Sequence, residues 1–499
     1  MEKLEIGDVT AHIIRDGKRN LRFSFGSVPA MTLTPGSSEF HPIAGEIVDL
    51  FLIERFLSYG YTTRRDYRAM VVDAWRAHAY SCGEPAPDRR ISAKGKAVYY
   101  KCDCDKIYKI TADGIKRYTS SKKARFWCDT CEAPQVEPDL SVQPTELLPL
   151  LRSVFRVAEE QELVFAALLL AFFHPGMVSP ILVLLGSRGT SKTTTSKQLC
   201  ELVSPSVVNP LVAFPAKEDA LLAQLTNSYL TAFDNVAFPI NPRFADIFCQ
   251  FVTGSTYAKR KLYCDNDKLL IPLRGKAILN GIDEIASKDD FAERCCVVNL
   301  APIPPEERLT DTEVNNLFER VKPRLLGCIF NTLSAILANR NTFTEVRKPR
   351  MAEFYVFGLK AIEAIGENPD DFATAYLGDV AAQVADAEAR LPIIRAVNEL
   401  FQKRGEATIK ETPADLSRHL NNIASHNDIK LPELTPESVT KTIKKNAPAL
   451  LRQGFELILP EGRKNKRSIE LRASEEIAKT IRRVKNNNIL DDLDDLEDL

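Results

Sequence analysis

The segment Ile181–Val203 constrains the fold of this chain more than any other. Five apolar residues, Ile181–Leu185, lead directly into the loop Gly186–Thr193, and the helix-forming stretch Ser196–Val203 follows. A strand, a glycine-containing loop with a lysine, and a helix are the setting in which backbone N–H groups and a helix N-terminus bind phosphate. The pattern therefore predicts a phosphate-binding loop in an α/β domain.

The side chains of this loop are expected to contact ATP and Mg²⁺. Lys192 would reach the β- and γ-phosphates, and the Thr193 hydroxyl would hold the metal. Ser191 stands where most such loops have a second glycine, and serine adopts a positive φ less easily than glycine does. The predicted nucleotide-binding residues are Gly186, Gly189, Thr190, Ser191, Lys192, Thr193 and Thr194.

Two further apolar runs, Tyr229–Phe233 and Lys276–Leu279, have the length and composition of buried parallel strands. Each ends in a polar side chain. Asp234 is expected to bind Mg²⁺ together with Thr193, and Asn280 is placed to contact the γ-phosphate or the attacking water. Arg294 is placed to act as an arginine finger in a neighbouring subunit's site.

The residue after Asp234 is Asn235, where most related ATPases have a glutamate that polarises water. Either the base comes from elsewhere, with Glu218 or Asp219 as candidates, or hydrolysis is slow. The predicted catalytic residues are Lys192, Asp234, Asn235, Asn280 and Arg294.

With these motifs in place, residues 150–365 resemble the AAA+ ATPases of bacterial mobile elements and phages. These are self-loading helicases related to the MCM and superfamily 3 groups, and the Cch-type proteins of staphylococcal cassettes are named examples. A serine at position 191 is typical of the MCM-type loop. The resemblance is carried by Gly186–Thr193, Ala232–Val236, Phe251–Tyr263, Ile278–Asp283, Leu300–Pro304, Lys322–Gly327 and Arg350–Phe354.

The resemblance implies a hexameric ATP-driven motor that acts on single-stranded or forked DNA, with each ATP site shared between two subunits. It also implies two alternatives for Arg324, which is either a second nucleotide sensor or an ordinary arginine of the lid helix. A hairpin is expected around Asp265-Asn-Asp267, because apolar arms flank this turn sequence. Its basic residues Lys259, Lys261 and Lys268 would contact the DNA backbone in the channel.

Four cysteines have the spacing of a structural zinc site. Cys102 and Cys104 form one close pair, and Cys128 and Cys131 form the other. Four thiolates in two pairs suit a tetrahedral Zn²⁺ that supports folding rather than catalysis. Unligated thiols are the alternative interpretation.

The C-terminal region predicts a winged helix. Thr412 and Thr435 each precede a proline in the manner of helix N-caps. The second cap opens the basic stretch Glu437–Lys445, and an apolar strand, a basic turn and another strand follow. Lys441, Lys444, Arg463 and Lys464 are predicted DNA contacts. A winged helix can also bind protein instead of DNA.

The totals favour a cytoplasmic protein. The formal net charge is −1, but the last nine residues carry six acids and no base, so the rest of the chain is mildly basic. The charged N-terminus predicts no secretory signal, and the apolar runs noted at Leu163–Phe173 and Ile181–Leu185 are too short to span a bilayer. The acidic tail serves either solubility, docking to a protein partner, or electrostatic mimicry of DNA.

The sequence thus predicts a multidomain protein with an α/β AAA+ P-loop core, an N-terminal α+β region, a zinc ribbon and a C-terminal winged helix. In the N-terminal region, strands are expected at Val9–Arg15 and Leu21–Phe25 and helices at Ile43–Leu57 and Arg64–His78. The predicted function is a DNA helicase that replicates a mobile element, and the alternative is an ATP-gated initiator that assembles on DNA without unwinding it. The predicted domains are 1–92 (α+β), 93–135 (zinc ribbon), 136–149 (linker), 150–384 (ATPase), 385–475 (winged helix) and 476–499 (acidic tail).

Overall fold

The computed structural model divides the chain into two compact units, each with its own apolar core. The first unit comprises Met1–Glu284 and Arg294–Asp379, and the second comprises Ile285–Glu293 and Val380–Leu499. The described residues are 5–26, 28–62, 64–121, 123–128, 131–186, 189–260, 268–281, 289–343, 348–459 and 468–481.

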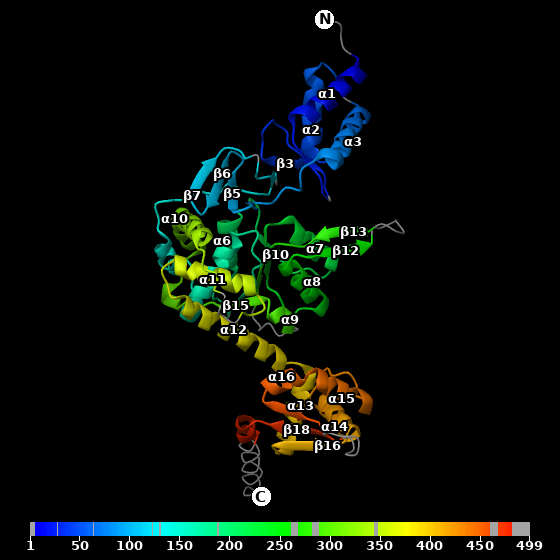
Figure 1. The fold of residues 1–499 in the computed structure, drawn as a ribbon, viewed down its shortest axis with the longest axis vertical. Helices are drawn as coiled ribbons and strands as arrows, with labels where there is room; N and C mark the ends of the chain where they lie inside the picture. Colours follow the sequence, from blue (N-terminus) through cyan, green and yellow to red (C-terminus); the bar gives the residue numbers. More distant parts are fainter. Residues whose placement is uncertain are drawn as a thin grey trace. The chain divides into compact units, whose positions relative to one another are not determined.

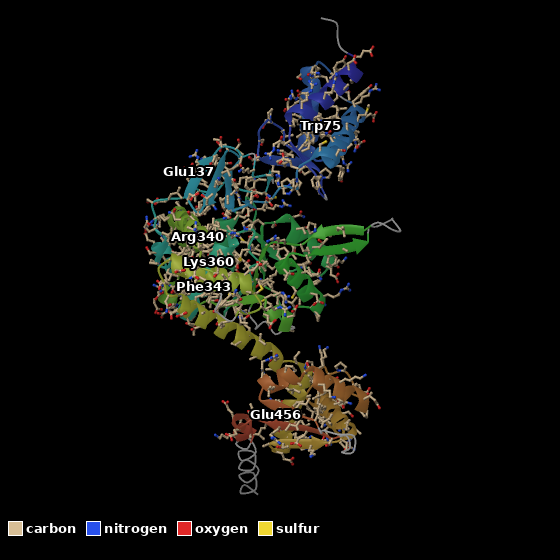
Figure 2. All side chains as sticks on the ribbon, viewed as in Figure 1. Trp75, Glu137, Arg340, Phe343, Lys360 and Glu456 are labelled. Atoms are coloured by element: carbon tan, nitrogen blue, oxygen red, sulfur yellow. The ribbon has the colours of Figure 1, made fainter. Side chains whose placement is uncertain are left out.

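Three helices and a small sheet form the N-terminal part of the first unit. The helices are α1 (Ile6–Asn20), α2 (Glu46–Ser58) and α3 (Arg65–Cys82). The sheet has the order β1 (Phe23–Ser24), β2 (Ala30–Met31), β3 (Glu39–Pro42) and β8 (Phe126–Trp127). Trp75 of α3 is buried against α1, where a Cβ on Gly17 would lie 2.5 Å from its ring (Figure 2). Only glycine at position 17 allows the two helices to pack this closely.

The predicted strand at Val9–Arg15 is wrong, because these residues lie in α1. Their β-branched side chains suggested a strand, but the buried residues Val9, Ile13 and Gly17 follow one another at intervals of four, which is the spacing of one helix face. The two predicted helices correspond to α2 and α3.

A second antiparallel sheet follows α3. Its strands pair in chain order, and α10 (Asp311–Ala338) packs against β6 and β7 (Figure 1). Tyr100 and Tyr108 of this sheet lie against Phe330 of α10. The strands are β4 (Ile91–Lys94), β5 (Ala97–Asp103), β6 (Lys106–Thr111) and β7 (Gly114–Tyr118).

Five short parallel strands form the central sheet of the first unit. In spatial order they are β10 (Leu211–Ala213), β11 (Leu230–Asp234), β14 (Lys276–Asn280), β9 (Ile181–Leu185) and β15 (Cys295–Asn299). Every residue of β9 and β14 is buried, which explains why these strands are nearly continuous apolar runs. Because the strands are parallel, the residues that follow β9, β11 and β14 meet at one edge of the sheet.

Helices surround this sheet. α6 contacts β11 and β14, α7 contacts β11, and α5, α10 and α11 pack together. Within the described residues, α10 is the one helix long and apolar enough to cross a membrane, but 56% of its most apolar window is buried, as in the core helix of a folded domain. The helices are α4 (Leu147–Arg152), α5 (Glu162–Phe172), α6 (Lys192–Val203), α7 (Glu218–Asn227), α8 (Pro242–Thr253), α11 (Ala352–Ala364) and α12 (Pro369–Ala389), with 3₁₀ turns at Pro144–Glu146, Glu159–Gln161 and Pro305–Glu307.

The C-terminal end of α6 is bonded to the antiparallel sheet and the segment after it. The buried Arg90 guanidinium donates to the carbonyls of Lys101 at 2.8 Å and Pro205 at 3.1 Å. The Tyr100 hydroxyl donates to Val203 O at 3.1 Å, and the Gln135 amide donates to Leu202 O at 3.0 Å. The last three of these hydrogen bonds therefore join the residues around β5 to the end of α6 and the turn after it.

The stretch expected to be a linker packs on α10. Asp139 N donates to Pro323 O at 2.9 Å, and the side chain of Asn331 donates to the carbonyls of Leu140 and Val142. A Cβ on Gly327 would lie 1.8 Å from Asp139 O. Glycine at this position lets the extended segment lie directly on the helix.

Between α8 and β14 the chain forms a separate two-stranded antiparallel hairpin. Its strands are β12 (Thr256–Arg260) and β13 (Lys268–Pro272), in the register Thr256↔Pro272 to Arg260↔Lys268. The hairpin predicted from the sequence is therefore present. Its turn lies outside the described residues.

The second unit contains helices and a three-stranded sheet of order β16-β18-β17. Thr412 and Thr435 accept hydrogen bonds from Asp415 N and Ser438 N, so both predicted N-caps are present. Val439 and Ile443 of α15 belong to the core of this unit. The elements are α9 (Asp289–Ala292), α13 (Pro392–Arg404), β16 (Thr408–Glu411), α14 (Pro413–His426), α15 (Pro436–Lys445), α16 (Ala447–Arg452), β17 (Phe455–Ile458) and β18 (Ile469–Ala473).

Candidate nucleotide-binding site

The loop after β9 has the backbone shape that a phosphate cradle requires. Gly186 has φ of +155° and Gly189 has φ of +86°, which glycine adopts without strain. A Cβ on Gly186 would lie 2.5 Å from the hydroxyl of the buried Thr190. Ser191 has φ of 56° and ψ of 29° at the start of α6, so it adopts the left-handed conformation that the sequence argued against. Ser187 and Arg188 lie outside the described residues.

Lys192 is the first residue of α6, and its ammonium group points back to the loop. Its Nζ donates to Gly186 O at 2.7 Å. Partial burial lowers the pKa of Lys192, and the negative charge of Asp234 opposes that shift. A lysine held next to the loop backbone, with its charge partly desolvated, is suited to bind phosphate oxygens.

The ends of β11 and β14 meet the first turns of α6. The Thr193 hydroxyl donates to Asp234 Oδ1 at 3.3 Å. Asn235 N donates to Asp234 Oδ1 at 3.1 Å and to Asn280 Oδ1 at 2.8 Å, and the Asn280 amide donates to Ser196 Oγ at 3.3 Å. The hydroxyl and carboxylate oxygens of Thr193 and Asp234 have the chemistry that Mg²⁺ prefers.

Asn280 is 1% exposed and bonds to neighbouring protein groups. It fixes the backbone of Asn235, which has φ of 52°, a value that asparagine tolerates better than most residues do. Asn280 therefore positions Asn235 next to Asp234 in this structure.

A cavity of about 960 Å³ lies beside the loop and α6. Gly189, Ser191 and Thr194 line one side of it. The other sides come from residues 152–157 and from residues 301–317. Neither segment was predicted to line the site, although Leu300–Pro304 belongs to the resemblance, because both reach the cavity only through packing. The size of the cavity is in the range of small-molecule sites.

Arg294 lies away from this cavity. It precedes β15, whose first residue Cys295 pairs with Ile181 at the start of β9, so Arg294 is at the sheet edge opposite the loop. The residue is 9% exposed, and its carbonyl accepts from Ile181 N at 2.9 Å. A role in a neighbouring subunit's site would require its side chain to turn outward. The arginine finger remains a prediction.

The two candidate bases interact with α8 and the hairpin. Glu218 accepts from Arg243 at 2.7 Å and from the Tyr257 hydroxyl at 3.2 Å, and Asp219 pairs with Lys259 at 2.5 Å. Neither acid lines the cavity beside the loop. Arg324, the other residue left open, pairs with Glu146 at 2.6 Å.

The four cysteines do not gather into a metal site. In the described part of the chain, one group of three potential ligands lies within 4.8 Å, and it consists of Asp103, Cys104 and Asp105. Cys102 is buried in β5, and burial raises its pKa to about 12, whereas Cys104 lies in the turn after the strand. Cys128 and Cys131 do not complete a four-thiolate arrangement with these two. The residues as placed do not fit a tetrahedral zinc ion.

Of the predicted DNA contacts, three have described side chains. Lys259 is half-buried and paired with Asp219, and Lys441 and Lys444 lie on the exposed side of α15. Lys261, Arg463 and Lys464 lie outside the described residues, as does the side chain of Lys268.

Comparison with protein families matches the central part of the chain. Residues 147–380 match the model of the actinomycete integrative conjugative element replication protein. This segment contains the loop, the central sheet and the helices α10 and α11, and amounts to just under half of the chain. The matched family is a different one from the Cch-type proteins that the sequence resembles. No curated protein matches the chain.

Solved structures give weak matches. The A form apo structure of the NrS-1 C-terminal region (305–718) is 12% identical, with a TM-score of 0.38, and the alignment covers 93% of this chain and 98% of that chain. A JCV helicase structure is 12% identical, with a TM-score of 0.25 and coverage of 46% and 66%. At these scores the alignments do not define a common fold.

Proposed function

We propose that the chain is an ATP-dependent DNA helicase or translocase of the AAA+ type that acts in the replication of a mobile element. The observation that carries this proposal is the convergence of Lys192, Thr193, Asp234 and Asn280 at the sheet edge that follows β9. A cavity of about 960 Å³ is lined by Gly189 and Ser191 of the same loop and by Thr194 of α6. The family match over residues 147–380 supports the role in replication. Replication takes place on intracellular DNA, so the proposed location is the cytoplasm.

Each residue at the sheet edge has a defined task in this proposal. The loop N–H groups and Lys192 bind the phosphates of ATP, and Thr193 and Asp234 hold Mg²⁺, which supplies charge neutralisation when bound. Asn280 holds Asn235 in its left-handed conformation and thereby orients the end of β11. The proposed assignment to the MCM-like group rests on the loop sequence alone. The family match over residues 147–380 does not support this subtype.

The DNA contacts in this proposal come from the hairpin and the second unit. Lys259, Lys261 and Lys268 would lie along the hairpin, and Lys441, Lys444, Arg463 and Lys464 would face DNA from a winged helix. The order α13-β16-α14-α15-α16-β17-β18, with all three strands in one sheet, supports a winged helix. The exposure of Lys441 and Lys444 on α15 supports a nucleic-acid contact there.

A second candidate function is an ATP-gated initiator that assembles on DNA without unwinding it. The observation that favours it is the missing base: Asn235 cannot accept a proton, and Glu218 and Asp219 are engaged with Arg243, Tyr257 and Lys259. Such a protein would bind ATP and DNA but turn over slowly.

Strand displacement on forked DNA distinguishes the two functions. The wild-type protein is expected to displace the strand with ATP, and Lys192→Ala is expected to lose both displacement and ATP hydrolysis, because the phosphates lose their cationic partner. Lys197→Ala, an exposed lysine one turn further along α6, is the matched control and should keep both activities. ATP-dependent DNA binding without displacement would select the initiator. Retention of hydrolysis in Lys192→Ala would contradict both candidates.

A further inference from the structure

A cleft separates the N-terminal part of the first unit from the base of the hairpin. It has a volume of about 800 Å³ and is lined by residues 86–89 and Trp127 on one side and by α7, Lys259 and residues 270–276 on the other. A second cavity of about 600 Å³ shares Arg89 and Trp127 and continues toward β10. No residue of the phosphate-binding loop lines either cavity, so the cleft is separate from the nucleotide site.

Trp127 is an aromatic side chain that lines both cavities. The Arg89 guanidinium carbon lies 6.0 Å from the centre of the indole ring. The same guanidinium donates to Thr226 O at 3.4 Å and to Asn227 Oδ1 at 3.3 Å, at the end of α7. Arg89 thus holds the half-buried ring in the wall shared by both cavities. A fixed aromatic ring in a cavity wall is a platform on which a nucleobase can stack.

The opposite wall supplies positive charge. Arg274 is exposed and donates to the neutral carbonyl of Gly176 at 2.8 Å, a bond that leaves its charge intact. The two acids of the cleft are both paired with lysines, Asp219 with Lys259 at 2.5 Å and Asp88 with Lys94 at 2.9 Å. The cleft therefore combines a guanidinium that can bind phosphate with acids whose charges are already compensated.

Apolar side chains complete the surface. Leu270 of the hairpin is 57% exposed and Val28 is 47% exposed, and both line the cleft. Bases of a single strand expose apolar faces that such side chains cover, whereas the bases of a duplex are stacked on each other. The combination of cation, aromatic ring and apolar wall therefore favours a single strand.

We propose that this cleft binds single-stranded DNA, with a base stacked on Trp127 and a phosphate bound by Arg274. The inference rests on the proposed action on DNA, and it adds a binding site at the base of the β12–β13 hairpin that is distinct from the hairpin tip and from the second unit.

Tryptophan fluorescence of the full chain tests the proposal with a poly-dT oligonucleotide. The chain has two tryptophans, and Trp75 is 1% exposed in a helical core, so a change on binding reports Trp127. We expect the oligonucleotide to quench the emission and Trp127→Phe to remove the quench. Trp127→Ala should raise Kd on the order of tenfold, since one stacked base is lost. Arg274→Ala should weaken binding and reduce the salt dependence by roughly one ion.

Arg76→Ala is the matched control, because Arg76 is an exposed arginine on α3 outside both cavities and should leave Kd unchanged. Unaltered thermal melting and basal ATP hydrolysis in the Trp127 and Arg274 variants show that they fold. If the wild type binds poly-dT without quenching and both variants bind equally well, the cleft is not the site, while the helicase proposal stands. If poly-dT does not bind at all, both proposals fail. If a peptide of residues 491–499 quenches the emission with a lower Kd than poly-dT does, the cleft is a site for an acidic peptide instead.

Discussion

Two residues that frame the candidate nucleotide site have a backbone conformation that is costly for side chains other than glycine. Ser191 has φ of 56° and Asn235 has φ of 52°. Asparagine tolerates this region, but serine is strained there by about 1 kcal/mol or more. The strain at Ser191 accompanies the turn that places Lys192 against Gly186 O. Ser191 therefore lowers the stability of the folded chain while its left-handed backbone places Lys192 next to the loop.

Replacing Ser191 with glycine tests this interpretation. We expect Ser191→Gly to stabilise the nucleotide-free protein by up to about 1 kcal/mol, because strain relief exceeds the added entropy of the unfolded chain. Thermal denaturation measures the change. Ser191→Ala keeps the Cβ and is the control that should show no gain. Equal melting temperatures for the two variants would show that the strain at Ser191 does not exceed the entropy that glycine adds to the unfolded chain.

A buried lysine makes stability depend on pH. Burial lowers the pKa of Lys276 to about 7, and its ammonium group donates to Met177 O at 2.7 Å and to Ser179 Oγ at 2.9 Å. Between this pKa and the ordinary value for lysine, the unfolded chain binds more protons than the folded chain, so stability attributable to Lys276 rises with pH in this window. Below pH 7 both states are protonated and the contribution is constant.

The free energy of unfolding of the wild type, relative to Lys276→Met, is therefore expected to rise between pH 7 and pH 10. Chemical denaturation of both proteins at several pH values measures the difference, in which other titrating groups cancel. A difference that is independent of pH would show that Lys276 keeps its ordinary pKa in the fold.

At the scale of elements, α10 is central to the first unit. It contacts the antiparallel sheet, α5, α11 and the segment before α4. Gly327 provides the closest of these approaches, since a Cβ there would lie 1.8 Å from Asp139 O. The packing of residues 136–149 on α10 thus depends on the glycine at position 327.

Gly327→Ala is expected to destabilise the protein by about 1–3 kcal/mol through overpacking, despite the better helix propensity of alanine. Gly378→Ala is the matched control, because a Cβ at Gly378 in α12 meets nothing within 4 Å. That variant should gain roughly 0.5–1 kcal/mol. Denaturant unfolding measures both changes. A neutral Gly327→Ala variant would show that the segment moves away without cost.

The elements also show which parts of the structure the sequence could predict. β9, β11 and β14 were predictable because each is a buried apolar run that ends in a polar residue, and parallel pairing brings those ends together. The helix at Val9–Arg15 was missed because β-branched residues obscured a four-residue spacing. The four thiols were expected to gather, but Cys102 lies buried in β5 and Cys104 in the turn after it, where the group of potential ligands consists of Asp103, Cys104 and Asp105.

The cavity walls at residues 152–157 and 301–317 could not be predicted from local pattern. They approach α6 only after the whole first unit has packed. The same is true of the cleft at Trp127, which is formed by residues more than 100 positions apart in the sequence, such as Arg89 and Arg274. Motifs identify residues that carry chemistry, whereas long-range packing determines the spaces in which they act.

At the scale of the whole molecule, an ATP site shared between two subunits, as the sequence resemblance implies, makes a prediction about Arg294. This residue lies at the edge opposite its own loop, so any role in hydrolysis would be in another subunit's site. Arg294→Ala should bind ATP but not hydrolyse it. Mixing it with inactive Lys192→Ala subunits should partly restore hydrolysis, since some sites then combine an intact loop with an intact arginine. A mixture as inactive as its components would contradict a shared site.

The bonds at the far end of α6 have a mechanical consequence. This helix begins at the phosphate-binding loop and ends where Arg90, Tyr100 and Gln135 bind the carbonyls of residues 202–205. If ATP binding tilts the first turn of this helix, these bonds would pass the tilt along its twelve residues to the antiparallel sheet. The motion would then reach the N-terminal part of the unit, whose strand β8 carries Trp127.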